Sequence, residues 1–158
     1  MLHLLHLGTV KSLLLFLLAV CTTNAAEFSG IAPGATARAN VPLNTIQQRY
    51  VAEGGNPVPP HAVAVLAVPP GFSPDKSFPI LVALSPSDFK RQNRDDREQF
   101  YRQSAFAEGW ALLAGDGPQP ARHDTAGWRA GITLAALDAL HRGFPASRKW
   151  PVASFRGS

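Results

Sequence analysis

The chain of 158 residues has 46% hydrophobic and 16% charged residues, a balance that is typical of one globular domain and excludes an intrinsically disordered protein. Its formal net charge is +4, and the basic residues at positions 90–98 are interleaved with acidic ones. We therefore expect this run to be a solvated surface and expect no nucleic-acid partner, because a phosphate-binding stripe needs clustered charge of one sign.

The N-terminal segment, residues 1–26, has the pattern of a secretory signal peptide. A basic residue precedes the short leucine-rich run Ser12–Val20, and small residues follow that suit cleavage after Ala25 or Ala26. The run is shorter than the roughly 20 residues that span a bilayer, so we expect a secreted or periplasmic protein without a stable membrane anchor. Two alternatives stay open: an uncleaved anchor, and a lipoprotein modified at Cys21, the only cysteine.

Residues 27–60 are rich in Gly, Pro, Ala and Asn, which predicts a loosely structured lead-in with a short strand at 47–52. Two continuous apolar runs follow, Ala62–Val68 and Pro79–Leu84, and turn residues close each of them. Continuous runs that contain β-branched residues are typical of strands buried on both faces. The Pro-Gly link between the runs leaves their relative direction open.

The next segment carries the signals of a helix and a third strand. Asp95 can cap the helix with Glu98 as its capping-box partner, and Gly109 ends it. Four side chains share one face at helical spacing: Phe100, Tyr101, Ser104 and Ala105. The apolar run Trp110–Ala114 then predicts a buried strand.

A second helix is predicted from its cap at Thr125 to Arg142, with Pro145 as a stop signal. Its apolar stripe comprises Trp128, Ile132, Ala135 and Ala139, and His141 near its end can favour the helix macrodipole. Trp150–Phe155 reads as a fourth strand. The order strand, strand, helix, strand, helix, strand predicts an α/β fold with a mostly parallel sheet flanked by helices.

Several short phrases within residues 61–158 accompany this order of elements. They are Val68-Pro69-Pro70-Gly71-Phe72, Gly109-Trp110 before a strand, Gly127-Trp128 at the start of a helix, and Trp150-Pro151-Val152-Ala153. On these residues the chain resembles the N-terminal half of the α/β-hydrolase superfamily, in particular secreted serine esterases similar to polyhydroxybutyrate depolymerases. The resemblance implies a partial α/β-hydrolase-like domain whose full-length relative hydrolyses a small-molecule ester.

The resemblance stops at the nucleophile elbow that the family places after this last strand. The elbow has the pattern Gly-x-Ser-x-Gly, because a sharp turn lifts the serine clear of the sheet and glycines avoid clashes. The corresponding residues here are Ser154-Phe155-Arg156-Gly157-Ser158, so Arg156 stands at the nucleophile position and Ser154 and Ser158 replace the outer glycines. Arginine cannot serve as this nucleophile, and the family's acid and histidine would follow the elbow.

What the resemblance leaves is one wall of a site. The loop 85–89 would correspond to the family's oxyanion loop, with the Ser87 N–H as the candidate donor and a plain polar turn as the alternative. Asp116 and the pair His123-Asp124 read as turn and loop residues, without metal-ligand spacing. We expect no cofactor and no metal, since no nucleotide-binding glycine motif or CxxC motif is present.

Two functions stay open from the sequence. The first is a truncated or frameshifted secreted α/β hydrolase that is inactive as this chain. The second is a small exported non-catalytic binding or interaction protein that uses half of the scaffold. An independent flavodoxin-like module is a third and weaker reading, because a phosphate-binding loop is missing from the sequence.

Overall fold

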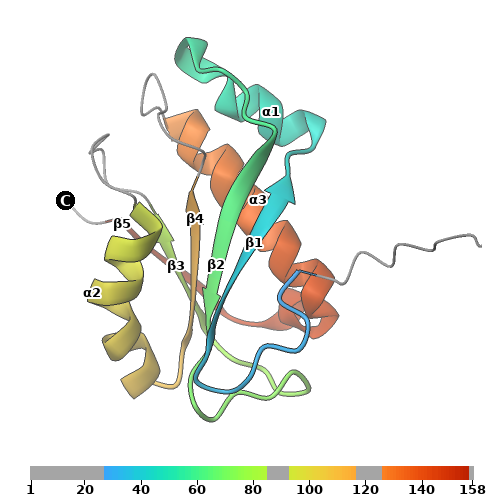
Figure 1. The fold of residues 1–158 in the computed structure, drawn as a ribbon. Coiled ribbons are helices and arrows are strands. Elements are labelled where there is room, and N and C mark those ends of the chain that lie inside the picture. The colour runs from blue at the N-terminus through green and yellow to red at the C-terminus, as the bar shows by residue number, and fades with distance from the viewer. Residues whose placement is uncertain (1–26, 85–92, 117–125, 157–158) are drawn as a thin grey trace, which may run out of the picture.

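A computed structural model describes residues 27–84, 93–116 and 126–156, with the backbone alone at 93–99, 116 and 155–156. These residues form an α/β fold in which one five-stranded sheet lies between helices (Figure 1). The strands are β1 (Thr36–Pro42), β2 (His61–Ala67), β3 (Ile80–Leu84), β4 (Ala111–Asp116) and β5 (Val152–Arg156). The helices are α1 (Thr45–Val51), α2 (Asn93–Ala107) and α3 (Ala126–Gly143), with 3-10 turns η1 (Glu53–Gly55) and η2 (Pro145–Lys149).

The sheet is mixed, with the strand order β1-β2-β4-β3-β5. β2 runs antiparallel to both of its neighbours, whereas β3 is parallel to β4 on one side and to β5 on the other. The predicted α/β class is therefore confirmed, but only two of the four pairings are parallel. The helix α2 connects β3 to its parallel partner β4, and α3 then leads from β4 to β5, which is parallel to β3 on the other side.

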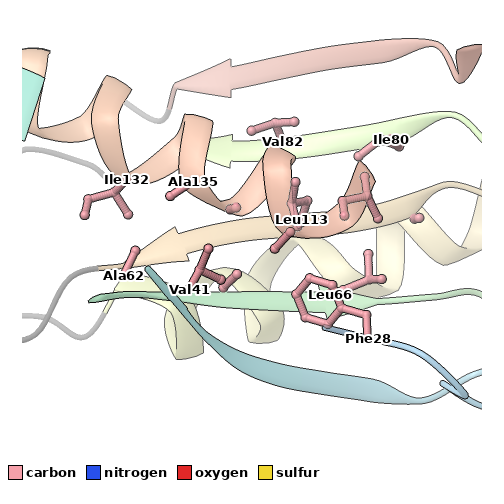
Figure 2. Close-up of a cluster of buried hydrophobic side chains, with 14 of the residues drawn as sticks. Phe28, Val41, Ala62, Leu66, Ile80, Val82, Leu113, Ile132 and Ala135 are labelled. Atoms are coloured by element: carbon pink, nitrogen blue, oxygen red, sulfur yellow. The ribbon is translucent and has the colours of Figure 1, made fainter. Parts of the chain in front are cut away.

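The larger core lies between α3 and the sheet. Alternate residues of the strands, such as Leu66, Ile80 and Leu113, point to this face and are buried against Ile132 and Ala135 of α3 (Figure 2). The predicted stripe of α3 is confirmed, because all four of its members are buried: Trp128, Ile132, Ala135 and Ala139. Burial of apolar area at about 25 cal/mol per Å² makes this face the main source of stability.

The opposite face of the sheet is covered by α2. Leu112 and Ala114 of β4 form a smaller core there, and Tyr101 and Phe106 of α2 pack against it. The predicted helix is present, and two members of its predicted face, Tyr101 and Ala105, turn toward the sheet, whereas Phe100 and Ser104 are exposed. Phe100 is 63% exposed, since Tyr101, Ala105 and Phe106 mark the side that turns toward the sheet.

Residues 27–60 are better ordered than the predicted lead-in. The expected strand at 47–52 is instead helix α1, which Asn44 caps: its side chain accepts from the Gln47 N–H while the Gln47 side chain accepts from the Asn44 N–H. The buried Gln47 also donates to Asp138 of α3 at 2.6 Å. The strand of this region is β1, which adds to the sheet beside β2.

Residues 27 and 28 fasten the beginning of the described chain to the end of α3. The Arg142 guanidinium donates two hydrogen bonds to the Glu27 carboxylate, at 2.9 and 3.0 Å, and Phe28 is buried in the core. The Arg142 hydrogen bond lowers the pKa of Glu27 below its ordinary value of 4.5. This contact fixes the beginning of the described chain beside the C-terminal end of α3, at one corner of the fold.

Candidate functional site

The carboxyl ends of β3, β4 and β5 lie at the same end of the sheet, and open α/β sheets bind their ligands outside these strand ends. Leu84 ends β3 and Asp116 ends β4. Because β2 runs the other way, with Val63 opposite Asp116, its first residue His61 also lies at this end of the sheet. The topology thus brings His61 to the candidate site, whereas chain order alone did not predict a histidine there.

Three residues of the expected elbow lie in the part of the chain that the structure describes, Ser154, Phe155 and Arg156, and all three are in β5. Ser154 is opposite Val82 and Arg156 is opposite Leu84, so extended backbone continues through the nucleophile position. Ser154 is exposed. Ser87, the pair His123-Asp124 and Ser158 lie outside the described residues.

An apolar cavity of about 440 Å³ lies at this end of the sheet, between α1, α3 and the end of β3. Its lining is formed by Tyr50, Leu84, Ala126, Arg129, Ala130, Thr133 and Leu134. Its size is within the range of small-molecule pockets, and the lining is mostly apolar with few polar groups, as is common in such pockets. The cavity offers a mostly apolar surface to a ligand, with Arg129 as the charged residue of its lining.

Sequence reasoning missed this cavity, although a signal for it exists. Ala126, Ala130 and Thr133 recur on α3 at helical spacing, beside the predicted core stripe. Small side chains at these positions leave space above the helix. Tyr50 could not be found in this way, because the α1 segment was expected to be a strand.

A second polar contact lies at the opposite end of the sheet, where α3 leads through η2 into β5. His141 Nδ1 and the Ser147 hydroxyl oxygen are 2.7 Å apart, and Ser147 is only 1% exposed. Burial, then the nearby positive charge of Arg148, lowers the pKa of His141 below its ordinary value of 6.5. A serine beside a neutral histidine has the composition of a nucleophile and base, but a buried hydroxyl cannot reach a substrate.

The described residues hold no group of three or more His, Cys, Asp or Glu side chains that is suited to a metal ion. Among the helices that the structure describes, none combines the length and apolar character needed to cross a membrane. Comparison with known proteins finds no protein-family model and no curated protein that matches this sequence.

Proposed function

We propose that this chain is a non-catalytic, exported form of the front half of an α/β-hydrolase-like domain, whose full-length relative hydrolyses small esters. The strand order supports the proposal. A sheet of order β1-β2-β4-β3-β5 in which only β2 is reversed resembles the N-terminal half of the α/β-hydrolase sheet. In that arrangement the loop after β3 corresponds to the oxyanion loop, and the nucleophile turn would follow β5.

The observation that carries the loss of activity is the position of Arg156. It continues β5 in register with Leu84 at the point where the family needs a sharply turned serine. A frameshift in the coding sequence after Ala153 accounts for a chain that resembles the family up to that residue and departs from the elbow pattern at Ser154 and Arg156. This origin is tested by translating the coding DNA from codon 154 onward in the other two reading frames. One of these frames is expected to encode a Gly-x-Ser-x-Gly sequence.

The activity proposal is tested with the purified chain, p-nitrophenyl butyrate and a fluorophosphonate probe that labels activated serines. We expect no hydrolysis above the buffer rate and no labelling, because a nucleophile needs a base within hydrogen-bond reach. The Ser147→Ala variant is the matched control, since Ser147 has a histidine within hydrogen-bond distance. Saturable turnover that Ser147→Ala abolishes would show a working nucleophile and overturn the proposal.

A binding function is the second candidate, and the apolar cavity favours it. The test is a titration with the fluorescent anion 1-anilinonaphthalene-8-sulfonate. We expect one saturable site that is lost in Ala130→Trp, which fills the cavity, and retained in Val58→Trp, a change at an exposed residue outside the cavity lining. Equal binding by both variants would mean that the dye binds elsewhere.

A further inference from the structure

Residues 27 and 28 are docked on the fold by both of their side chains. The Glu27 carboxylate accepts two hydrogen bonds from the Arg142 guanidinium, in the last turn of α3. The Phe28 ring is 6% exposed and belongs to the larger core (Figure 2). Moving these two residues away from α3 therefore requires the exposure of an aromatic ring to water and the loss of an ion pair.

The backbone of the same segment is bent and closely packed. A Cβ atom at Gly143 would lie 2.2 Å from the Glu27 carbonyl oxygen, so the two backbones approach each other where a side chain has no room. Phe28 has a φ of 67°, in the left-handed region that residues other than glycine rarely adopt. Its carbonyl oxygen accepts a hydrogen bond from the Ile31 N–H at 3.3 Å. Residues 27–31 thus form a turn and not an extended chain, and we call them the strap.

The strap lies directly after the expected cleavage sites of the N-terminal segment. Glu27 is the first residue after the bond that follows Ala26, and the second residue after the bond that follows Ala25. A protease needs an accessible, locally unfolded chain on both sides of the bond that it cleaves, so a packed segment is cut only from its opened state. On the carboxyl side of both bonds, the docked strap presents a buried ring and a left-handed residue instead.

We propose that the strap makes removal of the N-terminal segment conditional on the folding state: the bonds after Ala25 and Ala26 are hydrolysed only while the strap is undocked. This inference rests on the proposed export, since it takes a signal peptidase as the protease. Hydrolysis adds water across the C–N bond, which leaves a carboxylate on the released segment and an ammonium group on the new first residue. A chain that folds before it meets the peptidase keeps its N-terminal segment, so the export route must deliver the chain unfolded.

The size of the effect follows from the ring alone. Burial of one phenylalanine side chain lowers the population of the undocked strap about tenfold to hundredfold. The ion pair with Arg142 adds to this, and the left-handed backbone of Phe28 subtracts from it. We therefore expect cleavage of the folded precursor to be at least about tenfold slower than cleavage of the unfolded precursor.

The order of folding and cleavage is tested with the full precursor, unfolded in urea, and a purified signal peptidase in detergent. In one arm the precursor is diluted into buffer that already contains excess peptidase, and in the other the peptidase is added after refolding. The cleaved fraction, read by intact mass after the same short incubation, is expected to be much larger in the first arm. Equal cleavage in both arms overturns the inference and leaves the proposed export standing. No cleavage in either arm overturns both, because residues 1–26 are then not a cleavable signal.

Variants separate the strap from the general stability of the fold. Phe28→Ala is expected to speed cleavage of the refolded precursor about tenfold, and Arg142→Met, which leaves the core intact, is expected to speed it by a smaller factor. Val65→Ala is the matched control, since Val65 is 3% exposed in the smaller core on the α2 side of the sheet. It weakens the fold away from the strap, so cleavage is expected to stay slow. Equal acceleration by Phe28→Ala and Val65→Ala, or none by Phe28→Ala, overturns the role of the strap.

Discussion

His141 shows how a single environment decides the role of a residue. Its place in the last turn of α3 suggests a cation that complements the helix macrodipole, and such a role would raise its pKa. Burial and Arg148 have the opposite effect, so the neutral ring is the stable form beside Ser147. Sequence position could not reveal this, because the burial depends on η2 folding back against the helix end.

The lowered pKa of His141 makes stability depend on pH in a defined window. The unfolded chain binds the proton more readily, so the stabilisation is complete above pH 6.5 and is lost as pH falls through the lower folded value. We expect the free energy of unfolding in urea to fall between pH 7.5 and pH 5.5, and to fall less in His141→Asn. Glu27→Gln is the control, since the Glu27 contribution is lost only below pH 4.5. An equal fall in His141→Asn and the unmodified chain would exclude His141 as the cause.

At the scale of elements, Gly131 allows α1 and α3 to pack closely together. A Cβ atom at Gly131 would lie 2.7 Å from the Gln47 carbonyl oxygen and 2.6 Å from Val51 Cγ2, so the helices touch through backbone. Gly131→Ala must push them apart. We expect it to destabilise the fold by about 1–3 kcal/mol, measured by urea unfolding. Gly71→Ala, where a Cβ meets open space, is expected to have little effect. Equal losses in both variants would mean that helix contact is not the cause.

The elements that the sequence predicts best are those with a strong apolar period. α3 and β2–β4 were found from such runs, because their burial is continuous along the chain. α1 and β1 were missed for a physical reason. α1 depends on the polar Asn44–Gln47 capping box and on contact with a glycine. β1 is an edge strand in which apolar residues alternate with polar ones such as Arg38 and Asn40. Their stability comes from neighbours far away in the sequence.

At the scale of the whole molecule, topology decided what chain order could not. The prediction left the direction of β2 open. Because β2 runs antiparallel to β4, His61 lies at the end of the sheet where β3 and β4 end. The cavity likewise combines residues of α1, β3 and α3 and has no local signature. The lack of a Gly-x-Ser-x-Gly pattern at residues 154–158, by contrast, is read from sequence alone, because an elbow depends on residue types at fixed spacing.

The corner where Glu27 and Phe28 meet α3 adds a prediction about export. Glu27 directly follows the second of the two expected cleavage sites, the one after Ala26, and its carboxylate is bound by Arg142. The intact mass of the exported protein is expected to correspond to a chain that begins at Ala26 or Glu27, because small residues precede both positions. A mass that includes residues 1–25, or a lipid adduct at Cys21, would contradict this.

The strand order has a consequence in time. β3 lies between β4 and β5, both of which follow it in the chain, so neither of its edges can be satisfied while residues 80–84 are the newest to emerge. A chain that leaves a ribosome or a translocation channel amino end first must hold β3 unpaired until position 116, and half-paired until position 156. Such late closure over long loops is slow, and it leaves the nascent chain in need of protection from aggregation until its last strand arrives.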